Sequence, residues 1–398
     1  MSSDEHIAEG VRLSERAEAI DDEVFRIALG LPPGVISLTA GEPDFPTSDF
    51  VREAAIQAIR EEKTHYTNPA GIMPLREEIS NKLKRENSVA YSPGEIIVAP
   101  GSASAIWLMM YALADPGDEV LIPDPAWFHY SVLARLAGMT PVRIRLDSDT
   151  GFRLDGEELE KKVSKRSRML ILNTPSNPTG KVLTRSELEE VSGVAERQDL
   201  KIISDEIYEK IVYPPHKHVS IASLSGMKER TILINGMSKG YAMTGWRIGY
   251  AASSTELTSK MTSLLGYSLV CASSISQYAA VEALRNPESL IYAEKMVNAW
   301  SRRREIVMKH VGSNTDVLSA IEPQGTFYGW LDISGSGMTG NEVSEGLLRE
   351  RNIAVFPGSL FGEEGAAHVR VSFATSDDVV EKGMEGLCEF LHEHKRVR

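Results

Sequence analysis

Short apolar runs recur through the middle of the chain, and several are separated by segments with helical spacing. The runs have the length of buried strands and lie at residues 95–99, 119–123, 141–146, 169–173, 201–204, 231–234 and 247–252. Residues 103–114 and 185–198 have the apolar spacing of helices between such strands. Strands that alternate with helices predict an α/β fold with a mostly parallel sheet covered by helices on both faces.

The two ends of the chain have a different pattern. A helix is expected at residues 12–27, a brief strand at 35–38, and helices at 49–62 and 73–85. Beyond about residue 274, a long helical stretch at 277–311 is interrupted only by Asn-Pro at 286–287. Short strands near Val317, Phe327 and Val355 and at 368–372 follow, and a helix closes the chain.

These patterns predict two domains, a large one with the parallel sheet and a smaller α+β one. The expected division is 1–45 as the N-terminal part of the small domain, 46–285 as the large domain, and 286–398 as the rest of the small domain.

Composition narrows the class of protein. The 398 residues include only two cysteines, no apolar stretch long enough to span a membrane, and an N-terminus without signal-peptide character. A reduced, cytoplasmic compartment is therefore expected. The net charge of −13 argues against nucleic acid as a main partner, because binding phosphates requires a basic face.

One lysine lies among small and turn-forming residues just after an apolar run. In the stretch at 235–250, Lys239 follows the expected strand at 231–234, and Arg247 comes eight positions later. A lysine amine can form a Schiff base with a carbonyl compound, and an arginine can bind a phosphate. Taken alone, the stretch is better explained as an ordinary loop with a solvated lysine; the other segments reverse this interpretation.

Other polar residues also follow expected strands. Asn177 comes after 169–173, and Asp205 and Tyr208 come after 201–204. Ligands of parallel sheets bind at the carboxyl ends of strands, so these side chains are expected near Lys239. Gly-Ser-Ala-Ser at 101–104 opens the helix at 103–114, and such a start can bind phosphate. Neither a dinucleotide glycine fingerprint nor a Walker lysine is present there.

At this point the chain resembles the class I aminotransferases of the fold type I pyridoxal-phosphate enzymes, especially the aspartate and aromatic aminotransferases. The strongest match is Ser-Lys at 238–239 with Met-Thr-Gly-Trp-Arg-Ile-Gly at 243–249. Further matches are Gly-Glu-Pro-Asp-Phe at 41–45, His-Tyr-Thr at 65–67, Asn-Pro-Thr-Gly at 177–180, Ser-Asp-Glu-Ile-Tyr at 204–208 and Val-Arg-Val-Ser-Phe-Ala at 369–374. All occur in order and at the spacing of the family.

The resemblance implies a site for pyridoxal 5′-phosphate. Lys239 would hold the cofactor aldehyde as a Schiff base and would later move the proton at the substrate α-carbon. Asp205 would pair with the ring nitrogen, which the cofactor needs in order to act as an electron sink. Asn177 and Tyr208 would hydrogen-bond the ring 3-oxygen, and Trp127 would stack on the ring face.

The resemblance also implies how the phosphate is bound. Its binding residues would be Ser102, Ala103, Ser104, Ser238 and Arg247. Tyr66 would reach the phosphate from a second subunit, because sites of this family are shared across a homodimer.

The substrates implied are an L-amino acid and a 2-oxo acid such as 2-oxoglutarate, exchanged in a ping-pong cycle. Arg370 would bind the α-carboxylate through two parallel hydrogen bonds from its guanidinium, and Gly41 would offer its backbone to the same group. Trp127 and Asn177 would also contact the substrate. No metal is expected.

Two departures from the family pattern leave the amino donor open between aspartate, aromatic and broad-range use. Ala103 stands where relatives that prefer dicarboxylic acids often have a lysine, and Asp21-Asp22 stands where they have Pro-Ser. A β-lyase or a decarboxylase with the same cofactor is the alternative reaction.

Overall fold

A computed structural model describes residues 14, 17, 20, 24, 27 and 30–396 of the chain. Most of the helix expected at 12–27, including Asp21 and Asp22, lies outside these described residues.

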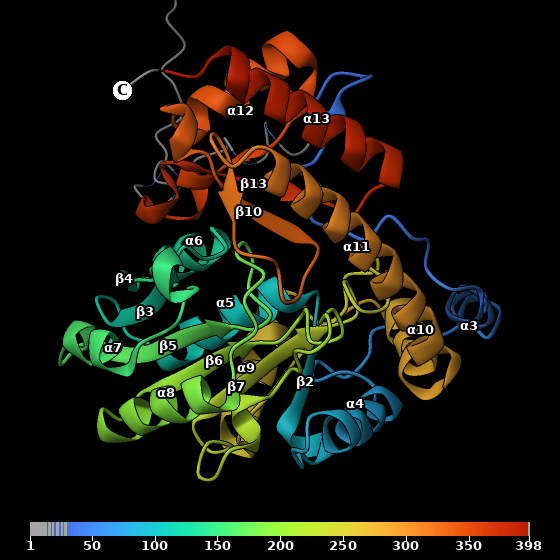
Figure 1. The fold of residues 1–398 in the computed structure, drawn as a ribbon. Coiled ribbons are helices and arrows are strands. Elements are labelled where there is room, and N and C mark those ends of the chain that lie inside the picture. Colours follow the sequence, from blue (N-terminus) through green and yellow to red (C-terminus); the bar gives the residue numbers. More distant parts are fainter. Residues whose placement is uncertain are drawn as a thin grey trace, which may run out of the picture.

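The centre of the molecule is a seven-stranded sheet (Figure 1). Its strands, in spatial order, are β2 (Ile96–Ala99), β8 (Gly249–Ala252), β7 (Thr231–Gly236), β6 (Lys201–Asp205), β5 (Ser167–Asn173), β3 (Glu119–Asp124) and β4 (Thr140–Arg145). All neighbouring pairs are parallel except those of β8, which runs antiparallel to both β2 and β7. The predicted mostly parallel sheet is confirmed.

Helices cover both faces of this sheet, as the continuous apolar runs of its strands require. On one face lie α5 (Ser102–Leu113), α6 (His129–Leu136) and α9 (Thr255–Ser268). On the other lie α4 (Met73–Glu86), α7 (Gly156–Lys162), α8 (Arg185–Arg197) and α10 (Ser274–Arg285). In β5, Met169 and Ile171 pack into the first core, whereas Leu170 and Leu172 pack into the second.

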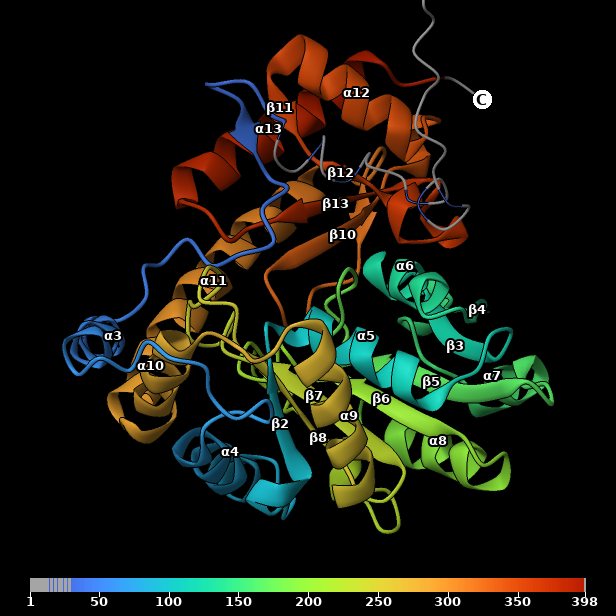
Figure 2. The ribbon, with the colours of Figure 1, turned by 180° about the vertical axis from the view of Figure 1, so that it is seen from behind.

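The C-terminal part builds a smaller layer above the sheet (Figures 1 and 2). An antiparallel sheet has the order β12 (Phe356–Pro357), β13 (His368–Ser372), β10 (Tyr328–Asp332) and β9 (Ser319–Ala320). Its helices are α11 (Glu288–Ser313), α12 (Gly340–Arg351) and α13 (Asp377–Glu393). None of the helices within the described residues is both long and apolar enough to cross a bilayer.

The two ends of the chain meet in this layer. The early strand β1 (Ile36–Ser37) pairs in parallel with β11 (Ile353–Ala354), while α3 (Asp49–Arg60) packs on α10. The division of the chain at residues 45 and 285 stays a prediction.

The strand directions place several loops at one edge of the central sheet. The parallel strands β3, β5, β6 and β7 end at the same edge. Because β8 is antiparallel to both neighbours, β2 also ends at this edge and β8 begins there. The segments that follow these strand ends, and the one before β8, therefore converge on one place.

Candidate active site

A cavity of about 270 Å³ lies at this edge, between the central sheet and the C-terminal layer. All but two of the residues predicted for the site line it: Gly41, Ser102, Ala103, Trp127, Asn177, Asp205, Tyr208, Ser238, Lys239, Arg247 and Arg370. They come from segments spread over more than 300 positions of sequence, so the fold, and not local proximity, brings them together.

The two predicted residues outside the cavity are Ser104 and Tyr66. The hydroxyl of Ser104 turns back within the first turn of α5 and donates to the carbonyl oxygen of Pro100 at 3.1 Å. Tyr66 is 84% exposed and lies away from the cavity lining. A single chain does not test its predicted role in a second subunit, so that role stays a prediction.

The start of α5 offers positive charge to the cavity. No side chain caps its first turn, so backbone N–H groups there are available to a ligand. Gly101 has a φ of 92°, and a Cβ at this position would lie 2.4 Å from a terminal nitrogen of Arg247. Glycine thus lets the guanidinium approach the helix start, and together they form a site for an anion.

Arg247 is held in place by its backbone and one hydrogen bond. Its φ of 56° lies in the left-handed region, which a non-glycine residue seldom adopts. Its Nη1 donates to the carbonyl oxygen of Thr244 at 2.9 Å. The next strand begins at Gly249, where a Cβ would lie 2.3 Å from the backbone nitrogen of Ser102. The close approach of β8 to α5 therefore sets the position of the arginine.

Lys239 reaches the cavity from the loop after β7 and is partly buried. Its amine donates to the carbonyl oxygen of Gly41. Burial lowers the pKa of Lys239 to about 8, because the ammonium form loses solvation; Glu42 opposes this effect, and Arg247 and Arg370 add to it. A substantial fraction of this amine is therefore neutral near pH 8, and a neutral amine is the form that reacts with a carbonyl.

Asp205 ends β6 on the floor of the cavity and is 2% exposed. The Tyr130 hydroxyl donates to its carboxylate at 2.7 Å, and the backbone N–H of Ile207 does so at 3.2 Å. Burial raises the pKa of Asp205 to about 6 even though both hydrogen bonds oppose the rise. Among the described residues that line the cavity it is the only carboxylate, so a basic group of a ligand would pair with it.

Arg370 on β13 is a buried cation, 3% exposed. It donates to the carbonyl oxygen of Thr39 at 2.8 Å and to Oδ1 of Asn177 at 3.2 Å. Its guanidinium lies 4.3 Å from the ring centre of Tyr328. Within the described part of the chain no carboxylate pairs with it, and its Nε has no hydrogen-bond partner. Such a group is poised to bind a carboxylate from outside.

Aromatic side chains complete the cavity. The hydroxyls of Tyr208 and Tyr328 lie 3.0 Å apart. The Trp127 ring, expected to face the cofactor, stacks on the His129 ring with centres 4.2 Å apart. Burial lowers the pKa of His129 to about 4, so this ring is neutral at physiological pH.

Sequence reasoning missed five residues that line the cavity, namely His129, Tyr130, Asn173, Ile207 and Tyr328. Asn173 had a usable signal, because it is a polar residue at the end of an apolar run. It accepts from the backbone N–H of Asn177 at 2.8 Å and donates to the carbonyl oxygen of Asp205 at 3.0 Å. The other four residues lie beside aromatic residues in the sequence, and this setting is typical of the hydrophobic core.

Known proteins resemble the chain over nearly its whole length. The family model "Aminotransferase class I and II" matches residues 33–387. An aspartate aminotransferase of Pyrococcus abyssi is 41% identical, covering 96% of this chain and 99% of that protein. Aromatic-amino-acid aminotransferase 2 of Thermococcus litoralis is 40% identical, covering 97% and 100%. The crystal structure of an aromatic aminotransferase from Pyrococcus horikoshii superposes with a TM-score of 0.91 at 40% identity, again covering 97% and 100%. The chain therefore belongs to the class I and II aminotransferase family.

Proposed function

We propose that this protein transfers the amino group of an L-amino acid to a 2-oxo acid such as 2-oxoglutarate, with pyridoxal 5′-phosphate bound at Lys239. The observation that carries the proposal is the placement of Lys239. Its amine, with a lowered pKa, lies in one cavity with a buried carboxylate, Asp205, and with the buried guanidinium of Arg370, to which no described carboxylate is paired.

The residues present fit this cofactor group by group. Its aldehyde needs an amine, which Lys239 offers. Its basic ring nitrogen needs an acid, and Asp205 supplies the one carboxylate that the described part of the chain brings to the lining. Its phosphate needs an anion site, which the uncapped start of α5 and the guanidinium of Arg247 provide. When bound, the cofactor supplies an electron sink that stabilises negative charge at the substrate α-carbon.

The protein's own side chains would bind, orient and move protons. Arg370 binds the substrate α-carboxylate, and the carbonyl of Thr39 and the amide of Asn177 hold its guanidinium plane. With the substrate fixed in this way, the amine of Lys239, freed when the substrate amine takes its place on the cofactor, would accept the proton from the α-carbon. Asp205 would hold the ring nitrogen in its protonated form, and the Tyr208 hydroxyl would donate to the ring 3-oxygen.

A homodimer with shared sites is part of the proposal. Large apolar or aromatic side chains are exposed on the single chain, including Tyr66 at 84% and Tyr267 at 95%. Exposed groups of this size favour burial against a partner. Tyr66 would then reach the phosphate site of the second subunit.

We propose that the amino donor is aspartate, an aromatic amino acid or a broad range of amino acids. The relatives named above are an aspartate and an aromatic-amino-acid aminotransferase. Their names favour amino transfer over the β-lyase or decarboxylase considered from the sequence.

A half-reaction tests the proposal. The cofactor-loaded protein is mixed with one amino acid at a time and no acceptor, and the cofactor is extracted and identified. We expect stoichiometric pyridoxamine 5′-phosphate, which 2-oxoglutarate converts back. Release of pyruvate and ammonia without pyridoxamine phosphate would instead identify a β-lyase.

A further inference from the structure

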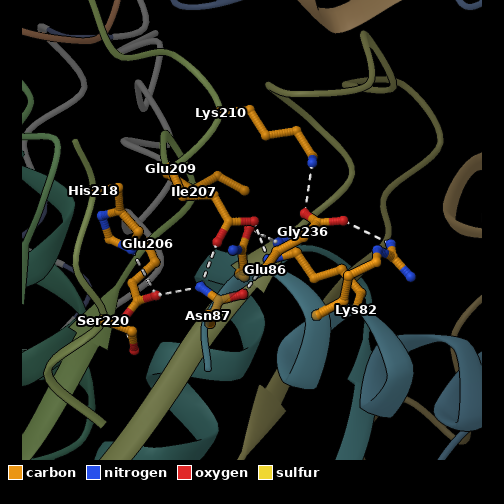
Figure 3. A network of polar contacts seen from close by, with 12 residues as sticks. Lys82, Glu86, Asn87, Glu206, Ile207, Glu209, Lys210, His218, Ser220 and Gly236 are labelled. Carbon is orange, nitrogen blue, oxygen red and sulfur yellow. Dashed lines mark hydrogen bonds and ion pairs between the residues drawn. The ribbon is translucent and has the colours of Figure 1, made fainter. Parts of the chain in front are cut away.

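The segment that follows β6 has two differently occupied sides. Asp205 and Tyr208 line the cavity, whereas Glu206 and Glu209 extend into a polar network on the other side (Figure 3). Glu206 is fully buried, with 0% exposure, although it is the immediate neighbour of Asp205. Glu206 is therefore a buried acid directly beside Asp205, the acid that lines the cavity.

The carboxylate of Glu206 has four hydrogen-bonding partners. Its Oε1 accepts from the hydroxyls of Ser204 at 2.9 Å and Ser220 at 2.7 Å. Its Oε2 accepts from Nδ2 of Asn87 at 3.1 Å and lies 2.9 Å from Nε2 of His218. An ionised carboxylate accepts about four hydrogen bonds, so all of its positions are filled here.

The buried ammonium of Lys82 in this network is directed at a different acid. Lys82, 1% exposed, donates to Glu209 and to Oδ1 of Asn87, the latter at 2.8 Å. Asn87 therefore stands between the ammonium and Glu206, as Figure 3 shows. The charge of Glu206 is stabilised by hydrogen bonds without direct contact to Lys82, and its field extends to Asp205.

Both charged and neutral titratable groups surround Asp205. They are Tyr130 and His129 on α6, Tyr208 and Glu206 on its own segment, Lys239 and Arg247 beyond β7, and Arg370 on β13. Burial is the main reason why the pKa of Asp205 is raised to about 6; Glu206 adds to the rise and Lys239 opposes it.

We propose that Glu206 is a positioning residue whose buried charge, held by Ser204, Ser220, Asn87 and His218, makes Asp205 bind a proton more tightly. Glu206 thereby sets the pH above which Asp205 offers a carboxylate to the cofactor ring nitrogen. This inference rests on the proposed function, because that function names the ring nitrogen as the partner of Asp205.

The test measures cofactor-site affinity against pH without any turnover. Full-length protein freed of cofactor is titrated between pH 5 and pH 8 with 4-deoxypyridoxine 5′-phosphate, and tryptophan fluorescence reports binding. This compound has the ring nitrogen and the phosphate but no aldehyde, so it cannot react with Lys239. Its own protonation is the same for every variant, so differences between variants come from the protein.

For the unaltered protein, affinity should fall as the pH drops below about 6 and Asp205 takes up a proton. In Glu206→Gln the midpoint of this fall should move to lower pH, on the order of one unit, because the neighbouring like charge is gone. Glu86→Gln is the matched control. Glu86 forms an ion pair with Lys210 at 2.7 Å (Figure 3), but it is not adjacent to Asp205. Its variant should therefore keep the midpoint.

Two results would overturn the inference. One is an unchanged midpoint in Glu206→Gln; the other is an equal loss of affinity at every pH, which means that Glu206 only supports the fold. If Glu206→Gln does not fold, His218→Arg places a permanent positive charge against Glu206 and should lower the midpoint in the same direction. Failure of the unaltered protein to bind the compound at any pH would contradict the proposed function itself.

Discussion

The acids Asp205 and Glu209 lie on one short segment, the first buried and the second partly buried, yet their surroundings differ. Asp205 faces the cavity and has two hydrogen-bond donors, and its pKa is raised to about 6. Glu209 faces the network, where Lys82 is its ion-pair partner and Asn87 donates at 2.7 Å. Although burial alone would raise its pKa, the charges of Lys82, Lys210 and His218 bring the pKa of Glu209 to about 2.

The difference separates function from stability. In the cavity, the charges of Lys239, Asp205 and Arg370 are incompletely paired within the protein, and a ligand would complete them. In the network, Lys82 and Lys210 have carboxylate partners inside the protein, namely Glu209 and Glu86. Removing a charge from the cavity should therefore damage binding and catalysis and spare the fold, whereas breaking the ion pair of Lys82 and Glu209 should chiefly destabilise the fold.

The largest effect is expected for Lys239→Ala. Loss of both the covalent attachment and the base should lower kcat by more than about 10⁴-fold, since a positioned acid–base group alone contributes up to about 10⁴. Lys239→Arg keeps a positive charge but cannot form the imine, and it should be equally inactive. Steady-state rates with thermal melting of both variants check this, because the fold should melt no lower than in the unaltered protein.

Lys82→Met should mainly affect the stability of the fold. Leaving Glu209 buried without its ion-pair partner should destabilise the fold by about 3–5 kcal/mol. Exposed Lys84 on the same helix provides the control, because Lys84→Met should leave stability nearly unchanged. Urea unfolding measures the difference, and a stable Lys82→Met protein with a normal midpoint would break the contrast between the two regions.

Asp205→Asn should stabilise the protein freed of cofactor while weakening cofactor binding. Because the folded-state pKa of Asp205 lies above its unfolded value of 3.8, the folded state loses stability as the pH rises from about 4 to 6. Above that range the loss amounts to about 3 kcal/mol. Unfolding at pH 5 and at pH 8 tests the sign, and the gain in the variant should be larger at pH 8. Glu209→Gln should instead destabilise the fold at both pH values.

Arg370→Lys keeps the charge but loses the two-pronged contact with the substrate carboxylate. We expect kcat/KM to fall by about 10²-fold, in line with the loss of charge-assisted hydrogen bonds. Arg168→Ala, at an exposed arginine on β5, is the matched control and should keep kcat/KM. An unchanged kcat/KM in Arg370→Lys would mean that another group binds the substrate carboxylate.

The sequence predicted the parts that depend on local pattern and on strand direction. Apolar runs identified the sheet strands, and polar residues just past their ends identified Asn177, Asp205 and Lys239. This works because parallel strands deliver the residues after their carboxyl ends to one edge. The Asn-Pro break was likewise confirmed, since α10 ends at Arg285 and α11 begins at Glu288.

Contacts between distant segments could not be predicted from local patterns in the sequence. The pair of Lys82 and Glu209 joins residues 127 positions apart, and on α4 the lysine reads as an ordinary surface residue. Tyr130 stands in an aromatic run, where packing is the commoner use, and only its hydroxyl contact with Asp205 reveals its role. Ser104 was predicted from its place in the turn, but the geometry of α5 directs its hydroxyl to Pro100.

The central claim is that Lys239 bonds covalently to the cofactor. The protein loaded with pyridoxal 5′-phosphate is treated with borohydride, digested, and its peptides are sequenced by mass spectrometry. The account predicts one pyridoxyl group per chain, on the peptide that contains Lys239. A label on a different lysine, or complete loss of the cofactor on unfolding after reduction, would contradict it.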